Sequence, residues 1–219
     1  FVWTRATQHL HLTVLYDGED IRDLTGAAEY QSSNEEVVKV KNGVALPVGN
    51  GTAEITLTAV GQTAKIAVTV SGLETPAPVS FKNDTLAALS KAGCNMGACH
   101  GSPSGKAGFR LSLRGYDPEL DIMTLRNEFY GRRTNTMAPA DSLILTKPLM
   151  QVAHGGGRRL RKEDIAYKIL HDWIGEGLRL DAEGTPDVVK IEVHPNQRVF
   201  QPTGERQQLR VDAHFSDGS

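Results

Sequence analysis

Alternation of apolar and polar residues dominates the first third of the chain and predicts β-strands. Leu10, Leu12 and Val14 alternate with polar neighbours, and residues 55–59 and 64–70 repeat the pattern. A period of two puts every second side chain on the same face of a strand, where it can enter a core. Turn-forming pairs follow these runs, namely Asp17-Gly18, Asn42-Gly43, Asn50-Gly51 and Gly61-Gln62. Residues 1–73 are therefore expected to form an all-β antiparallel sandwich that is incomplete at its amino end.

The period becomes helical after a proline-rich linker, Thr75-Pro76-Ala77-Pro78. Leu86 and Leu89 indicate one helix, which Asp84 is expected to cap, and residues 118–128 indicate another. Between these helices, a short alternating stretch is expected to form a strand: Phe109, Leu111 and Leu113.

The last helical segment has the clearest pattern. Six apolar side chains recur at helical spacing and share one face: Ile165, Ala166, Ile169, Leu170, Trp173 and Ile174. Gly177 stands where such a helix ends. Residues 79–180 are therefore expected to form a second, mainly α domain.

Strand character returns in residues 187–219, where the chain repeats part of its beginning. Gln207 to Val211, followed by Phe215 to Gly218, is similar to Gln8 to Leu12, followed by Tyr16 to Gly18. The repeat predicts the first strands of a second sandwich. The expected architecture is multidomain, and the chain is expected to be part of a longer protein.

The composition is that of an ordinary globular protein, and its charge argues against nucleic acid and anionic membranes as partners. Apolar residues make up 39% of the chain, charged residues make up 23%, and the formal net charge is -2. This charge gives no electrostatic reason to expect nucleic acid or an anionic membrane as a partner. No apolar run is long enough for a membrane span, and the start at Phe1-Val2-Trp3 has no feature of a signal peptide.

The two cysteines of the chain stand close together and are followed directly by a histidine, in the order Cys94, Cys99, His100. Covalent haem attachment needs two thiols that reach the two vinyl groups and a histidine after the second thiol that binds the iron. The usual spacer has two residues. Here the spacer has four, Asn95 to Ala98, and Gly97 is expected to permit the extra bulge. We expect Cys94 and Cys99 to form the thioethers and His100 to be the proximal iron ligand.

The surroundings of this Cys-x4-Cys-His motif resemble the cytochrome c-like domains of large planctomycete surface or periplasmic proteins. The residues that carry the resemblance are Lys91 to Gly101, Gly105 to Pro118, Ser142 to Leu145, Lys147-Pro148, His154 to Gly157 and Trp173-Ile174. The resemblance spans roughly residues 80–178. It implies one covalent haem c and a periplasmic or cell-surface location, and it supplies no known reaction.

Residues 8–72 resemble the bacterial immunoglobulin-like group 2 domain. The residues that carry this resemblance are Asp17-Gly18, Asp23 to Thr25, Tyr30 to Asn34, Val38, Asn42 to Val44 and Gly51 to Ile55. It implies an immunoglobulin-like sandwich that acts as a spacer or adhesion module and carries no chemistry.

The sixth iron position has several candidates. In cytochrome c-like folds the distal ligand comes from a loop just before the final helix, and His154 stands there, ahead of Gly155-Gly156-Gly157. Met150 and Met137 are its rivals, and an open position is a further alternative. Two histidines favour a lower reduction potential than a histidine and a methionine do.

Other interpretations of these residues remain open. Cys94 and Cys99 could form a local disulfide, stay inert thiols, or hold zinc together with His100 and His154. The basic cluster Arg158, Arg159, Arg161 and Lys162 is expected first of all to be the solvated start of a helix, and it also suits haem propionates or an acidic redox partner.

The sequence therefore predicts a c-type haem module that carries single electrons within a larger exported protein, with a redox partner that it does not identify. The alternatives are a haem-based sensing module with an open axial site and a structural surface module with zinc. No catalytic residue is identified, and any catalysis is expected elsewhere in the longer protein.

Overall fold

The computed structural model describes residues 7–16, 20–75, 77–200 and 203–219. The turn expected at Asp17-Gly18, the start at Phe1-Val2-Trp3 and Pro76 of the linker lie outside these residues. The chain divides into two compact units. Unit 1 comprises Phe1–Ala77 and Pro186–Ser219, and unit 2 comprises Pro78–Thr185.

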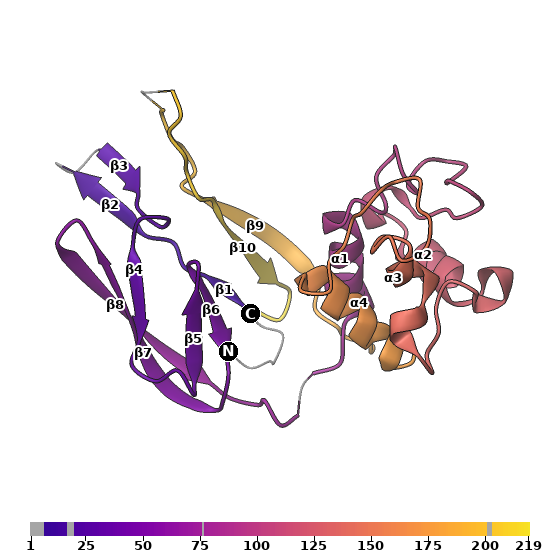
Figure 1. Ribbon diagram of the computed structural model, residues 1–219, viewed down its shortest axis with the longest axis horizontal. Helices are drawn as coiled ribbons and strands as arrows, with labels where there is room; N and C mark the ends of the chain where they lie inside the picture. Colours follow the sequence, from indigo (N-terminus) through magenta and orange to yellow (C-terminus); the bar gives the residue numbers. More distant parts are fainter. Residues whose placement is uncertain (1–6, 17–19, 76, 201–202) are drawn as a thin grey trace. The chain divides into compact units, whose positions relative to one another are not determined.

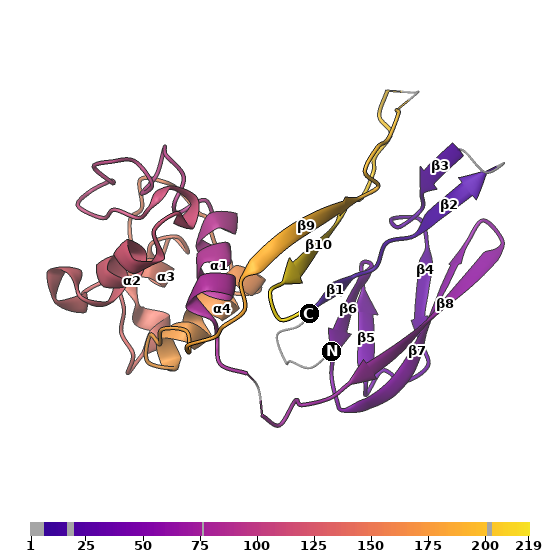
Figure 2. The ribbon, with the colours of Figure 1, turned by 180° about the vertical axis from the view of Figure 1, so that it is seen from behind.

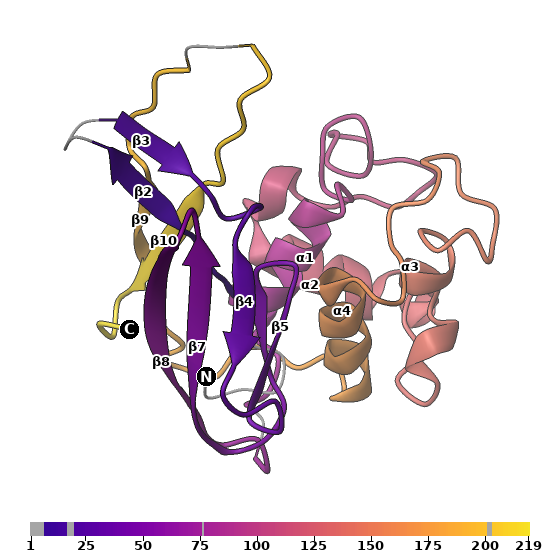
Figure 3. The same cartoon turned by 60° about the vertical axis from the view of Figure 1, so that its left-hand side comes forward.

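Unit 1 contains small antiparallel sheets (Figure 1). One sheet has the strand order β1 (Gln8–His9), β6 (Val44–Pro47) and β5 (Val38–Lys41). A second has the order β4 (Glu29–Ser32), β7 (Gly51–Ala59) and β8 (Gln62–Val70), and Figure 3 shows these strands side by side. A separate ribbon pairs β2 (Thr13–Tyr16) with β3 (Asp20–Asp23).

The core of unit 1 follows from the alternation seen in the sequence. In β7, Ile55 and Leu57 are buried, while the threonines between and after them are partly or fully exposed. These two side chains form one apolar cluster with three buried residues. The three are Leu10, directly after β1, Val38 in β5 and Ala45 in β6. The expected turn at Asn42-Gly43 is confirmed, because both residues adopt the positive φ values that a tight hairpin turn needs, 53° and 73°.

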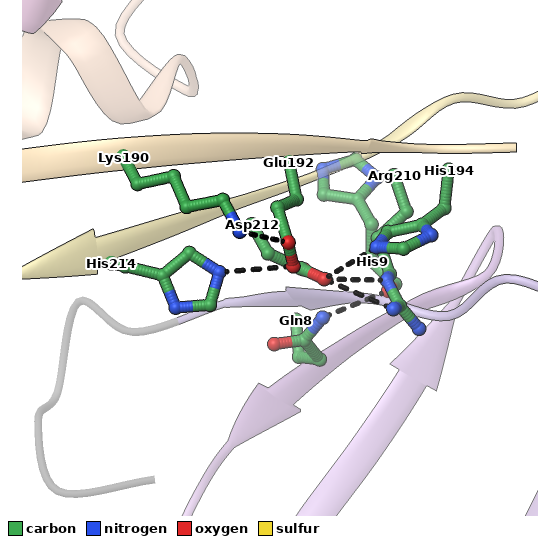
Figure 4. A network of polar contacts seen from close by, with 8 residues as sticks. All are labelled: Gln8, His9, Lys190, Glu192, His194, Arg210, Asp212 and His214. Carbon is green, nitrogen blue, oxygen red and sulfur yellow. Dashed lines mark hydrogen bonds and ion pairs between the residues drawn. The ribbon is translucent and has the colours of Figure 1, made fainter. Parts of the chain in front are cut away.

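Residues 188–215 contain a hairpin of β9 (Val188–His194) and β10 (Arg210–Phe215). One face of it carries a polar network (Figure 4), in which His214 Nε2 lies 3.2 Å from Glu192 Oε2 and Arg210 lies 3.0 Å from Asp212. The alternate residues, such as Ile191 and Val211, are 63% and 57% exposed. Exposed ion pairs add little stability. The hairpin therefore lacks an apolar core of its own.

Unit 2 is built from short helical segments. The α-helices are α1 (Leu86–Lys91), α2 (Pro118–Arg126), α3 (Leu143–Thr146) and α4 (Ile165–Gly175). The π-helical and 3-10 turns are η1 (Phe81–Thr85), η2 (Leu113–Gly115), η3 (Glu128–Gly131) and η4 (Pro139–Asp141). Figure 2 shows that long loops connect these elements.

Helix α4 is the centre of the core of unit 2 and confirms the helix expected at this place. Leu170, Trp173 and Ile174 are fully buried. The ring of Trp173 lies 5.2 Å from that of Phe81, and its Nε1 donates a hydrogen bond to the carbonyl of Arg179. The helix ends before Gly177, as expected.

A capping residue and a strand differ from the sequence-based expectation. Ser80, not Asp84, caps the first helical segment: its Oγ accepts from Asn83 N, and the Asp84 carboxylate accepts from Ser80 N. The segment from Phe109 to Leu113 is not a strand. Its amides have separate partners instead of a neighbouring strand: Leu111 N donates to His100 O at 2.8 Å, and Phe109 N donates to Lys106 O at 3.1 Å.

The expected fold class, an immunoglobulin-like sandwich joined to a mainly α domain with a second sandwich beginning at residue 187, is wrong. The chain is only 22% helical and 25% strand, and its sheets are small. In unit 2, Gly97, Gly101, Pro103 and Gly105 follow one another closely and favour turns over helix. In residues 187–219 the described strands are β9 and β10 alone. The molecule is a mixture of small α and β elements.

Candidate functional site

A cavity of about 540 Å³ in unit 2 brings the sequence-predicted ligands together. Cys94, Cys99, His100 and His154 all line it. Its apolar walls come from four different segments: Phe109, Phe129, Leu143, Ile144 and Pro148. Cofactor sites have volumes of about 300–1,000 Å³ and mostly apolar walls. The cavity therefore has the size and character of a site for one cofactor.

The imidazole rings of His100 and His154 are near-parallel neighbours in this cavity. Their centroids are 6.4 Å apart and their planes differ by 15°. Two metal–nitrogen bonds of about 2 Å, with roughly 1.1 Å from each nitrogen to its ring centre, span about 6.2 Å when they point in opposite directions. A tetrahedral angle at the metal would bring the centres to about 5 Å. The observed distance between the ring centres is close to that of two histidines on opposite sides of one metal.

Backbone carbonyls fix the tautomer of both rings. His100 Nδ1 lies 3.0 Å from Phe109 O, and His154 Nδ1 lies 2.7 Å from Gly157 O. A carbonyl can only accept, so each Nδ1 carries a proton, and in the neutral form of each ring Nε2 then has the lone pair. Metal-binding histidines are oriented by the same kind of bond. Both histidines are therefore prepared to bind a metal through Nε2.

Burial favours the neutral form of His100. It lowers the pKa of His100 below its usual value, and the neighbouring His154 lowers it further, against a raising effect of the Phe109 carbonyl. A metal ligand must be unprotonated, so burial of the ring favours the form that binds.

The motif loop folds back on itself between the two cysteines. His100 N donates to Cys94 O at 2.9 Å, and Cys99 N donates to Met96 O at 2.9 Å. Both cysteines are free thiols. Burial, followed by the nearby Cys99, raises the pKa of Cys94 to about 11. The thiol of Cys94 therefore stays protonated at neutral pH.

Gly101, not Gly97, is the glycine that the motif loop requires. Gly97 does not have a positive φ, and a Cβ there would meet only Leu113 Cδ1 at 3.9 Å. A Cβ on Gly101 would lie 2.1 Å from the carbonyl oxygen of Asn95. The expectation about Gly97 is wrong because the bulge closes at its end, where the chain after His100 passes directly over Asn95.

The two methionine candidates lie outside the set of residues that line the cavity. The side chain of Met137 is 93% exposed, in a turn whose amides donate to Asn135 Oδ1. Met150 follows α3 and is 46% exposed. Of the three candidates for the sixth position, only His154 lines the same cavity as His100.

Arg133 stabilises one wall of the cavity. Its guanidinium donates to the carbonyls of Thr124 and Gly108 at 3.0 and 2.8 Å, and it lies 4.6 Å above the centre of the Phe109 ring. It also pairs with Glu128 at 2.9 Å. Burial lowers the pKa of Arg133. Nothing in the sequence around Arg133 indicates burial, so sequence patterns alone do not single it out.

The described residues show neither a cluster of metal ligands nor a membrane-spanning helix. Among the described residues, no three His, Cys, Asp or Glu side chains gather closely enough to hold a metal ion. No helix in the described ranges is long and apolar enough to cross a membrane.

No protein-family model matches this chain, and no curated protein matches it.

Replacement of Gly101 by alanine is expected to destabilise unit 2. The added Cβ would collide with the backbone of Asn95, and a backbone clash can be relieved only by moving the loop. We expect Gly101→Ala to lower the free energy of unfolding by about 2 kcal/mol or more, measured by urea denaturation. Gly97→Ala is the matched control and is expected to change it by about 0.5 kcal/mol or less. Equal losses in both variants would contradict this interpretation.

The stability of the haem-free chain is expected to fall as the pH drops below the usual pKa of histidine, 6.5. Unfolded His100 takes up a proton there, whereas folded His100 resists it, so acid favours the unfolded state. His100→Asn keeps a donor for Phe109 O but does not titrate, and should reduce this pH dependence. Urea denaturation at neutral pH and at pH about 5 measures it. An unchanged pH dependence in His100→Asn would contradict this assignment.

Proposed function

We propose that unit 2 is a c-type haem module that transfers single electrons within a longer, exported protein. One observation carries the proposal: two imidazoles of fixed tautomer, 6.4 Å apart, line a cavity that both cysteines also line. In this assignment Cys94 and Cys99 form the thioethers. His100 is the proximal ligand and His154 the distal ligand.

The residues of unit 2 have distinct tasks in this proposal. The haem supplies an iron that changes its charge by one electron. His100 and His154 each offer Nε2 while their Nδ1 protons stay on backbone carbonyls. The apolar walls, such as Phe109 and Ile144, exclude water from the ring. Two histidine ligands favour a low reduction potential.

The proposal extends to location and partners through the chemistry of attachment. Covalent haem attachment takes place outside the bacterial cytoplasm in the families that the motif resembles. We therefore place the protein in the periplasm or at the cell surface, with a second redox protein as its electron partner.

The first test is the attachment of haem. We expect the chain, coexpressed with a haem-attachment system, to show a Soret band that stays with the polypeptide after extraction with acidified acetone. Cys94→Ala and Cys99→Ala should each retain one thioether, and the double variant should lose its haem to the solvent. A purified chain without a Soret band, or a metal analysis that finds zinc in place of iron, would refute the proposal.

The second test is the identity of the distal ligand. His154→Ala should leave the iron five-coordinate and high-spin, which absorption and electron paramagnetic resonance spectra detect. Met150→Ala and Met137→Ala are the matched controls and should keep the low-spin spectrum of the parent. If carbon monoxide binds the reduced parent without displacing a ligand, the axial site is open, and a sensing module replaces the electron carrier.

A further inference from the structure

Basic side chains gather on the cavity without acidic ones. Lys106, Arg132, Arg133, Lys147 and Arg159 line it, and no Asp or Glu is among its described lining residues. The whole chain, by contrast, has a net charge of -2. The cavity thus combines apolar walls with a positive field, which suits a largely apolar ligand that carries negative charge.

The five cations differ in what they already bind. Arg133 is committed to Thr124 O, Gly108 O and Glu128, so it belongs to the wall. Lys106 Nζ donates to Ala98 O at 3.0 Å, within the motif loop. Arg159 Nε donates to Gly156 O at 2.9 Å.

Arg159 also lies beside the cysteines. A terminal nitrogen of Arg159 would be 3.8 Å from a Cβ built on Gly93, the residue before Cys94. The side-chain ends of Lys106 and Arg159 are therefore associated with the edge of the cavity where the thioethers would form, while the backbone of Arg159 donates to Pro148 O at 2.8 Å, beside Lys147.

Arg132 and Lys147 come from other segments. Arg132 directly follows η3 and is exposed, and Lys147 directly follows α3. Lys147 Nζ donates to Ala153 O at 3.1 Å, which leaves two of its three N–H donors for other partners. Ala153 precedes His154, so an anion on Lys147 would bind next to the loop of the distal ligand.

Haem carries its two carboxylates on the edge opposite the vinyl groups that react with cysteine. We propose that Arg132 and Lys147 bind these carboxylates and so recognise the dicarboxylate of a tetrapyrrole before iron ligation and thioether formation. The inference deepens the proposed haem function and rests on it. Of the basic cluster expected from the sequence, Arg158, Arg161 and Lys162 do not line the cavity, and Arg159 lies on the cysteine edge.

The test uses the haem-free 219-residue chain and a metal-free porphyrin that cannot bind the histidines. Protoporphyrin IX and its dimethyl ester differ only in the two carboxylates. Quenching of the intrinsic fluorescence of the protein measures the affinity for each of the two porphyrins. A variant that is partly unfolded loses affinity for both, so the ratio of the two affinities is unaffected by a general loss of folding. We expect the parent chain to prefer the free acid by about tenfold or more.

Arg132→Gln and Lys147→Gln should each reduce this preference severalfold. Lys106→Gln, on the cysteine edge, and Arg158→Gln, outside the cavity lining, are the matched controls and should keep it. Excess inorganic phosphate should not abolish the preference, because a free anion lacks the apolar ring that fills the cavity.

Three results would overturn the inference. The parent chain could bind both porphyrins equally, or Lys106→Gln could lose as much of the preference for the free acid as Arg132→Gln and Lys147→Gln do. The third is a preference that phosphate abolishes. If the coexpressed chain nevertheless holds covalent haem, the haem function stands and only the assignment of the carboxylates fails. If neither porphyrin binds and no haem is attached, both proposals fail.

Discussion

The site depends on two hydrogen bonds from histidine to the backbone. His100 Nδ1 is bound by Phe109 O, and His154 Nδ1 is bound by Gly157 O. An imidazole with one nitrogen committed in this way has a single tautomer and a restricted orientation. Gly157 lies in the same loop as His154. Phe109 lies in the segment that bonds to the motif loop through Leu111 N and His100 O. The conformation of these two loops therefore determines where both lone pairs of the site point.

The loops are in turn held by a small number of polar contacts. Leu111 N donates to His100 O, and the next residue, Ser112, donates through both its amide and its hydroxyl to the buried carboxylate of Asp121 in α2, at 2.6 Å each. Burial raises the pKa of Asp121 above its usual value, against the lowering effect of the Ser112 bonds. The segment that orients His100 is thus tied to a helix by a buried network, which is costly to leave unsatisfied.

Residue types and spacing selected four side chains that the structure gathers on one cavity, Cys94, Cys99, His100 and His154. The fold around them was predicted less well. Helix α4 was predicted because six apolar residues share one face. The strand expected around Leu111 is absent, because alternation alone does not say whether a segment bonds to a neighbouring strand or to a loop. The burial of Arg133 depends on partners from several segments, which no local pattern reveals.

The contacts of Arg133 and the wall residues explain how unit 2 keeps a cavity although its helices are short. The apolar side chains along the walls of a cavity of about 540 Å³ make fewer packing contacts with protein than side chains in a filled core do. Phe109 packs against the edge of the core of unit 2, whereas Phe129 is 56% exposed, and the guanidinium of Arg133 lies 4.6 and 5.2 Å from the centres of these two rings. A ligand that fills the space would restore these contacts and bind only the folded chain, so its binding energy would add to stability. The short helices of unit 2 can then be sufficient, because in this proposal the haem forms part of the core that they enclose.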